Sequence, residues 1–234
     1  MWQKNTANCY QNNVAWLYMN KFVALLLSMA AALSGCTSPV NTQQSNRHIY
    51  IVHGYDASPS EHWFAWLKSE MEKTEARVSI IDLPTPDDPQ PQAWQRALET
   101  QVTSLDSNTY FVAHSLGSIT LLRFLEKHPG NAPIGGYILV SGFNERLPTL
   151  PQLDRFIKPD IDYGKLVQRA SSRVVISAPD DSVVRYRFSQ ALAKFLDARF
   201  ITVEQGNHFL ASDGFTEFPL VLAELQKAIA ASGR

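Results

Sequence analysis

The segment "NTYFVAHSLGSITLLRFLEKHPG", residues 108–130, decides the fold of this chain. Residues 109–114 form a short apolar run that is typical of a buried strand, and the pattern after residue 115 is that of a helix. Ser115 stands at the abrupt junction between the two. A serine at a helix start is often only an N-cap. It is a candidate nucleophile only if an acid and a base follow in suitable places along the chain.

The same kind of apolar run recurs along the chain, and amphipathic segments separate the runs. The other runs lie at 48–53, 77–82, 136–141, 173–178 and 199–204. Helices are expected near 60–75, 90–105, 116–128, 185–197 and 215–231. The runs are mostly continuous rather than alternating, which suits strands covered on both faces. This order predicts an α/β three-layer sandwich, with a mostly parallel sheet of about six strands and right-handed crossovers.

One segment, 143–162, interrupts this rhythm. It reads "FNERLPTLPQLDRFIKPDID", carries three prolines and shows no clear periodicity. A long irregular insertion in a compact domain is often a lid or a binding loop. A plain surface excursion is the other interpretation, and the sequence favours neither.

Composition limits the classes of function. The chain has 234 residues, of which 45% are hydrophobic and 18% charged, and this is enough to bury the core of one large domain. Its formal net charge is −1, with no basic cluster. The sequence therefore gives no indication of nucleic-acid binding.

The N-terminal region has the layout of an export signal. Residues 19–36 read "MNKFVALLLSMAAALSGC", in which one lysine precedes an apolar run and a run of small residues. We expect a signal peptide over 1–35, with Met19 as a possible true start. An uncleaved membrane helix, or an ordinary signal with an incidental cysteine, would fit the same pattern.

The last four residues of that segment, Leu33 to Cys36, resemble the lipobox of bacterial lipoproteins. The resemblance implies lipidation of Cys36 and membrane attachment through the lipid, and the polar stretch "TSPVNTQQSNR" that follows predicts a flexible tether over 36–47. Because Thr37 is not aspartate, the resemblance further implies the periplasmic face of the outer membrane. The predicted domain, 48–234, contains no cysteine, so disulfides cannot stabilise it.

Candidate catalytic residues follow four of the predicted strands. In an open parallel sheet, functional groups collect at the carboxyl ends of the strands. The sequences found there are His53-Gly54-Tyr55, His114-Ser115-Leu116-Gly117, Pro179-Asp180-Asp181 and Gly206-Asn207-His208. A serine, an acid and a histidine thus occur in the chain order that α/β-hydrolases use.

This constellation assigns a role to each residue. Ser115 is the expected nucleophile and His208 the base that takes its proton. Either Asp180 or Asp181 could orient the imidazole, and the other would satisfy turn amides. We favour Asp181 because it precedes Ser-Val-Val, which matches the loop that often follows this strand in hydrolases.

A tight turn around the nucleophile requires small neighbours. Ala113 and Gly117 provide them, as a variant of G-x-S-x-G with alanine in the first position. The backbone N–H groups of Leu116 and Tyr55 are the expected oxyanion hole, although Gly54 could simply permit a tight turn. His114 is expected to pack beneath the turn.

No cofactor is expected. The histidines show no zinc-binding spacing, and no G-x-G-x-x-G follows a strand.

Taken together, these stretches resemble the retinoblastoma-binding-protein-nine-like family of small serine hydrolases. The matching segments are "YIVHGYDASPSEHWFAWL", "IIDLPTPDDPQPQAW", "YFVAHSLGSITLLRFL", "ILVSGF", "DDSVV", "GNHF" and "FTEFP", between Tyr50 and Pro219. The resemblance implies an α/β-hydrolase fold without a large cap and a triad of Ser115, Asp181 and His208. It places Trp63 and Trp66 either near the pocket or in the core. Ala113 and Asn207 depart from the glycines that the family usually has there.

The functional prediction is a serine hydrolase that cleaves an ester, thioester or amide bond of a small substrate through an acyl-enzyme. The alternative is a non-catalytic envelope lipoprotein that uses the fold as a binding platform for a protein or ligand. The sequence does not identify a protein partner.

Overall fold

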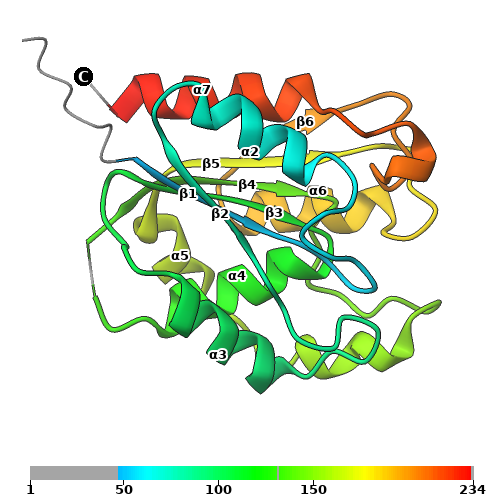
Figure 1. The fold of residues 1–234 in the computed structure, drawn as a ribbon. Coiled ribbons are helices and arrows are strands. Elements are labelled where there is room, and N and C mark those ends of the chain that lie inside the picture. Colours follow the sequence, from blue (N-terminus) through cyan, green and yellow to red (C-terminus); the bar gives the residue numbers. More distant parts are fainter. Residues whose placement is uncertain (1–46, 131, 233–234) are drawn as a thin grey trace, which may run out of the picture. The chain divides into compact units, whose positions relative to one another are not determined.

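The computed structural model describes residues 47–130 and 132–232. Six strands form one parallel sheet in the order β2-β1-β3-β4-β5-β6 (Figure 1). The strands are β1 (His48–Val52), β2 (Arg77–Ile81), β3 (Thr109–His114), β4 (Ile134–Val140), β5 (Ala170–Ser177) and β6 (Arg199–Thr202). The predicted sheet is therefore confirmed.

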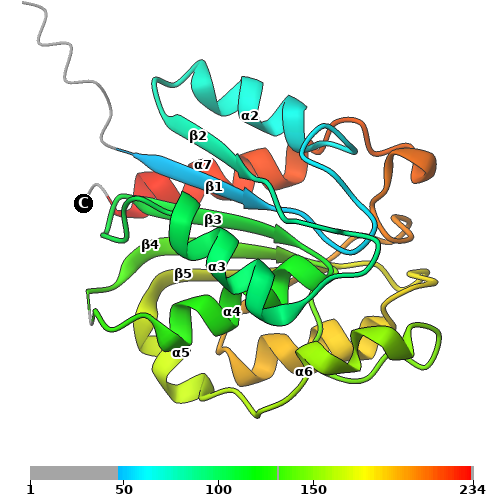
Figure 2. The ribbon, with the colours of Figure 1, turned by 60° about the horizontal axis from the view of Figure 1, so that its bottom comes forward.

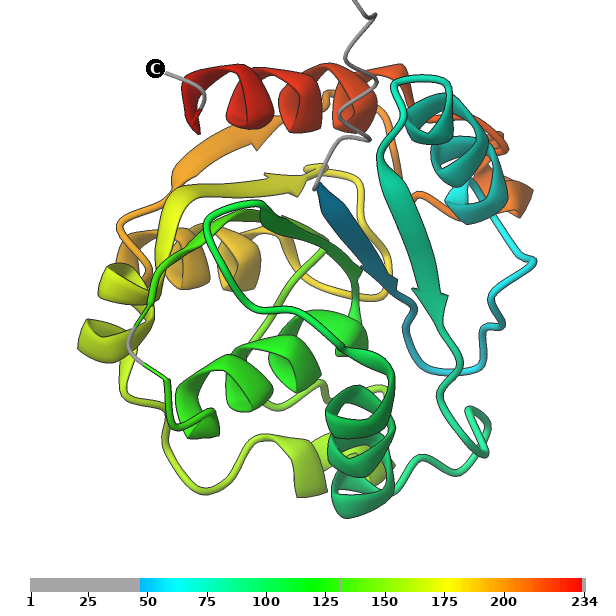
Figure 3. The same ribbon diagram turned by 60° about the vertical axis from the view of Figure 1, so that its left-hand side comes forward.

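Helices cover both faces of this sheet. They are α2 (Phe64–Glu72), α3 (Pro91–Gln101), α4 (Leu116–Lys127), α5 (Tyr163–Arg169), α6 (Tyr186–Phe195) and α7 (Pro219–Ser232). Figure 2 shows α3 to α6 on one side of the sheet, and Figure 3 shows α2 and α7 together on the other. The three layers make an α/β-hydrolase-like sandwich, and no large cap covers it among the described residues.

The continuous apolar strands follow from this layering. Successive side chains on a strand point to opposite faces, so each strand supplies two cores. On β1, Tyr50 and Val52 join the core beneath α3 to α6, whereas Ile49 and Ile51 join the core beneath α2 and α7. All four side chains are fully buried.

Helix α4 lies at the centre of the domain. Every residue from Leu116 to Leu125 is buried, including the polar Thr120 and Arg123. A helix that is enclosed on all sides needs apolar residues around its circumference, which explains the run "LLRFL". The structure thus holds the end of β3 and the start of α4 in fixed positions.

The chain reverses its direction of winding at β1. From β1 it runs outward to β2, and it then returns to β3 on the other side of β1. Such a switch point opens a crevice at the carboxyl ends of the two strands concerned. Ser115 follows β3 and His53 follows β1, so both lie at the edge of the sheet where the winding reverses.

Some expected elements differ from those observed. Segment 143–162 contains a 3₁₀ helix at Pro151–Phe156, and α5 follows directly after the segment, where we expected no helix. α5 has only seven residues, too few for its periodicity to stand out. β5 begins at Ala170 rather than 173, and α2 is confined to Phe64–Glu72 within the expected 60–75.

The predictions for the N-terminal region concern residues outside the described part. The signal peptide over 1–35, Cys36 and the tether up to residue 46 all lie there. Within residues 47–130 and 132–232, no helix has the length and apolar character needed to cross a membrane.

The packing of α4 against β1 yields a prediction for Gly117→Ala. A Cβ at Gly117 would lie 2.4 Å from the His53 carbonyl oxygen and 2.6 Å from that of Val52. Since both obstacles are backbone atoms, we expect the free energy of unfolding to fall by about 1–3 kcal/mol or more. Urea denaturation of the full chain would measure this loss.

The matched control is Gly164→Ala on α5. The nearest atom to a Cβ there is Asp162 Oδ1 at 3.4 Å, an ordinary contact. Its unfolding free energy should change by less than about 1 kcal/mol. Equal stability of the two variants would contradict the close packing of α4 on β1.

Candidate active site

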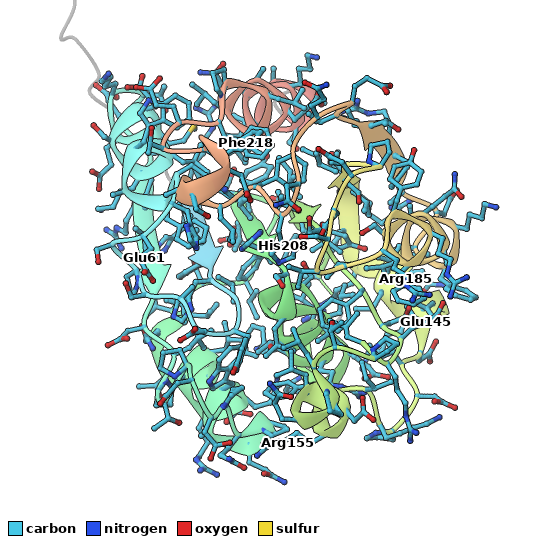
Figure 4. The ribbon with its side chains drawn as sticks, turned by 90° about the vertical axis from the view of Figure 1, so that its right-hand side faces the viewer. Glu61, Glu145, Arg155, Arg185, His208 and Phe218 are labelled. Atoms are coloured by element: carbon cyan, nitrogen blue, oxygen red, sulfur yellow. The ribbon has the colours of Figure 1, made fainter. Side chains whose placement is uncertain are left out.

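The candidate site lies at the carboxyl edge of the sheet. Figure 4 views this edge, with His208 near its centre and Phe218 above it. Ser115 is contributed by the end of β3, Asp181 by the loop after β5 and His208 by the loop after β6. The three side chains are separated by up to 93 positions in sequence, and the structure brings them together.

Ser115 occupies a strained turn. Its φ of 52° and ψ of −123° put a non-glycine residue in a region that costs on the order of 1–3 kcal/mol. The surroundings hold it there, because its N–H donates to the Val140 carbonyl (2.8 Å) and its carbonyl accepts from Ser118 N–H (2.9 Å). Its side chain makes no capping bond to α4. The N-cap interpretation of this serine therefore has no support in the structure.

The Ser115 side chain instead contacts His208. Ser115 Oγ lies 3.0 Å from His208 Nε2, and His208 Nδ1 lies 3.0 Å and 3.1 Å from the two Asp181 oxygens. An ionised carboxylate only accepts hydrogen bonds, so Nδ1 carries the proton that points to Asp181. Nε2 is then the acceptor for the serine hydroxyl. This geometry allows the histidine to withdraw a proton from Ser115.

The site is shielded from water. Ser115 and Asp181 are each 7% exposed, and His208 is 5% exposed. A buried carboxylate needs hydrogen bonds to remain charged. Asp181 receives them from Ser141 Oγ (2.7 Å), Val183 N–H (2.9 Å) and Val184 N–H (2.8 Å), in addition to the imidazole.

The two neighbouring aspartates have different environments. Asp180 Oδ1 accepts from the backbone N–H groups of Gly206 (3.1 Å) and Asn207 (3.0 Å), and these bonds, led by that of Gly206, lower the pKa of its carboxyl. Asp180 is exposed and has no hydrogen bond to His208 among those of the described residues, whereas both carboxylate oxygens of Asp181 lie within hydrogen-bonding distance of His208 Nδ1. Asp180 thus satisfies turn amides, and Asp181 faces the histidine.

Asn207, which stands where the resemblance described above implies a glycine, fixes the loop that carries His208. Asn207 has a φ of 41°, a conformation that asparagine tolerates better than most residues. Its side chain accepts from Ser182 N–H (2.9 Å) and Ser182 Oγ (2.8 Å) and donates to Asp213 (2.8 Å). The substitution therefore preserves the turn and links the acid loop to the base loop.

His114 has a role that the sequence did not reveal. Its Nε2 donates to the His208 carbonyl oxygen at 2.8 Å. Burial, followed by the nearby His208, holds the pKa of His114 well below 6.5 and keeps the ring neutral. His114 is thus more than packing beneath the turn, because it positions the backbone of the base.

Aromatic rings at the start of α2 pack against His114. Trp63 is fully buried, its ring packs edge-on against His114, and its Nε1 donates to the Phe209 carbonyl at 3.2 Å. Trp66 is partly buried against the core beneath α2 and α7. Trp63 therefore belongs to the core and also fixes the base loop.

The two amides expected to bind an oxyanion belong to Leu116, which directly follows Ser115, and to Tyr55, which directly follows Gly54. A Cβ on Gly54 would be 3.0 Å from Ser115 Cβ and 3.6 Å from Leu116 N, so the turn containing Tyr55 packs directly on the nucleophile. Neither the Leu116 N–H nor the Tyr55 N–H has an acceptor among the described residues. Both are available to a ligand. The Tyr55 hydroxyl lies 3.5 Å from the Gln152 side-chain nitrogen.

Ser141 also belongs to the site, through its bond to Asp181, and the sequence analysis did not predict this. It directly follows β4, with a φ of 48°, and it donates to Asp181. Its position at a strand end was the available signal, because the other three contributors occupy the same kind of position. In the described part of the chain, no three histidine, cysteine or acidic side chains are placed to hold a metal ion.

Comparison with known proteins identifies the family of this chain. The model of the serine hydrolase family matches residues 49–227. The YdeN protein of Bacillus subtilis (strain 168) is 42% identical over 175 residues, which are 75% of this chain and 92% of YdeN.

Solved structures share the fold of this chain. The crystal structure of B. subtilis YdeN superposes with a TM-score of 0.77 at 41% identity, covering 79% of this chain and 99% of that one. Est1E of Butyrivibrio proteoclasticus shares the fold at 14% identity, with a TM-score of 0.61 and coverage of 82% and 92%. This chain belongs to the serine hydrolase family and is a hydrolase with the α/β-hydrolase fold.

Proposed function

We propose that this hydrolase cleaves an ester, thioester or amide bond of a small substrate through an acyl-enzyme on Ser115. The observation that carries the proposal is the continuous contact from Asp181 through His208 to Ser115, with each step close to 3.0 Å. We also propose that the chain belongs, within the serine hydrolases, with the retinoblastoma-binding-protein-nine-like hydrolases that its sequence resembles.

The first half of the reaction forms the acyl-enzyme. Ser115 Oγ attacks the carbonyl carbon while His208 Nε2 takes the hydroxyl proton, and Asp181 stabilises the resulting imidazolium. The amides of Leu116 and Tyr55 donate to the oxyanion. His208 then gives the proton to the leaving alcohol, thiol or amine as the bond to the carbonyl carbon breaks.

The second half releases the acid. A water molecule gives a proton to His208 Nε2 and attacks the acyl carbon, and the proton returns to Ser115 Oγ as the carboxylic acid departs. The buried Asp181 network keeps the imidazole in the same orientation for both halves. The non-catalytic alternative is not favoured, because all three groups are present and in contact.

The test is hydrolysis of p-nitrophenyl acetate, p-nitrophenyl butyrate and acetyl p-nitroanilide. We expect turnover of at least one of these probes, and Ser115→Ala should lower kcat by about 10⁴-fold or more, because the nucleophile is lost. Ser212→Ala changes an exposed serine of the 3₁₀ helix Ala211–Asp213 and serves as the control. No turnover by folded wild-type protein, or equal activity of the two variants, would contradict the proposal.

The adjacent aspartates provide a second prediction. Asp181→Asn replaces an ionised acceptor by an amide and permits the wrong histidine tautomer, so kcat should fall by about 10⁴-fold. Asp180→Asn keeps an oxygen that can accept from Gly206 and Asn207, and kcat should stay within a few fold of wild type. Steady-state kinetics on the same ester distinguishes the two. A larger loss for Asp180→Asn would reassign the triad acid.

We also propose that the chain is a lipoprotein anchored through Cys36 at the periplasmic face of the outer membrane. The support is the sequence of 19–36 alone. In bacteria fed radiolabelled palmitate, the wild-type protein should incorporate label and sediment with membranes, and Cys36→Ser should do neither. Cys9→Ser is the matched control. Label retained in Cys36→Ser would show that the anchor lies elsewhere.

A further inference from the structure

Arg123 is a buried cation that takes no part in the proposed mechanism. It lies on α4, is only 4% exposed, and donates through Nε to the Phe156 carbonyl (2.8 Å) and through Nη2 to the Pro159 carbonyl (2.5 Å). Its Nη1 is buried and has no partner among the described residues. A buried guanidinium with a free donor needs an acceptor, because an unpaired buried charge is costly.

A cavity adjoins this guanidinium. It has a volume of about 560 Å³ and lies between the start of α3, the C-terminal half of α4 and the stretch 155–159. Its lining comprises Gln90, Pro91, Gln92, Gln95, Arg96, Glu99, Arg123, Lys127, Arg155, Lys158 and Pro159. The ligand site proposed below is this set of residues.

The charge of the lining is strongly unequal. Arg155 is paired with Asp88 (3.0 Å) and Lys158 with Asp160, both at the surface. When these two pairs are set aside, the cations Arg96, Arg123 and Lys127 face the single carboxylate of Glu99.

The acids near the buried guanidinium do not neutralise it. Glu126 lies close enough to raise the pKa of Arg123, but its carboxylate accepts from Asp162 N–H and does not line the cavity. Burial has a larger effect than Glu126, so the pKa of Arg123 is lowered. The lining therefore keeps an excess of positive charge that matches a dianion.

The start of α3 adds further donors. The helix begins at Pro91, and Gln90 before it provides no side-chain cap. The first N–H groups of a helix have no partner within it, and the helix dipole favours a negative charge there. Gln92, in this first turn, lines the cavity together with Arg96 one turn further along.

We propose that this cavity binds a phosphate monoester. A phosphate monoester carries a charge between about −1.5 and −2 near pH 7 and three acceptor oxygens. The buried guanidinium of Arg123, the exposed cations of Arg96 and Lys127 and the backbone N–H groups at the start of α3 provide the positive charge and the donors for it. The cavity is larger than inorganic phosphate requires, so the monoester has an organic part, against which Pro91 and Pro159 can pack.

The site is separate from the triad. Ser115 precedes the first residue of α4, and Arg123 lies eight residues later, which is about 12 Å along the helix. No triad residue lines the cavity. In Figure 4, Arg155 is at the lower end of the domain, well below His208. Binding at this site can thus be measured independently of hydrolysis.

The test is calorimetric titration of the full chain with glycerol 3-phosphate at constant ionic strength. We expect saturable binding with a Kd below about 1 mM, and acetate should bind at least tenfold more weakly because it has a single charge. Arg96→Gln and Lys127→Gln each remove an exposed cation that has no ion pair in the described structure, so folding should be unaffected. Each should weaken binding about fivefold or more.

The control variant is Lys194→Gln on α6, which changes the net charge equally at an exposed site outside the cavity. It should bind like wild type. No saturable binding to wild type, or equal weakening by Lys194→Gln, would overturn the proposal, whether or not the protein hydrolyses esters.

A second titration identifies the source of the phosphate. It uses a short-chain phosphatidic acid with ether-linked tails, which an esterase cannot cleave. Binding at least tenfold tighter than that of glycerol 3-phosphate, and still sensitive to Arg96→Gln, would support the site and assign it to a lipid headgroup. Equal or weaker binding with the same sensitivity would support a free phosphate monoester. Binding that is insensitive to Arg96→Gln in both titrations would contradict the site.

Discussion

The left-handed backbone of Ser115 is the constraint on which the site depends. An isolated serine would relax from φ 52°, so the fold must impose this conformation. It does so from two sides, because α4 is buried on all faces and Gly117 packs against the carbonyls that end β1. In this conformation the Ser115 hydroxyl makes no capping bond to α4 and lies 3.0 Å from His208 Nε2.

The remaining catalytic geometry depends on how two loops are joined. Asp180 and Asn207 link the acid loop to the base loop, and His114 and Trp63 hold the backbone around His208 from beneath. A hydrogen bond of about 3.0 Å from Ser115 to His208 thus rests on residues outside the group Ser115, Asp181 and His208. This division explains how irregular loops can hold a site that requires sub-ångström precision.

The sequence predicted the fold, and it singled out Ser115, Asp181 and His208 because each of them follows a predicted strand. Ser115, Asp181 and His208 each follow an apolar run, and parallel strands bring their ends to one edge. Sequence could not separate Asp180 from Asp181 by spacing, since only the fold decides which of two neighbours faces inward. The roles of His114 and Arg123 were hidden because their partners are backbone carbonyls 94 and 33 residues away. The sequence did not predict helix α5, because its seven residues are too few to show a helical periodicity.

The most direct measurement is a crystal structure of the chain after inactivation by an alkyl fluorophosphonate. The account predicts a bond between phosphorus and Ser115 Oγ, with the phosphonyl oxygen accepting from the N–H groups of Leu116 and Tyr55 and with His208 still bonded to Asp181. An adduct on another residue, or a phosphonyl oxygen directed away from both amides, would contradict it.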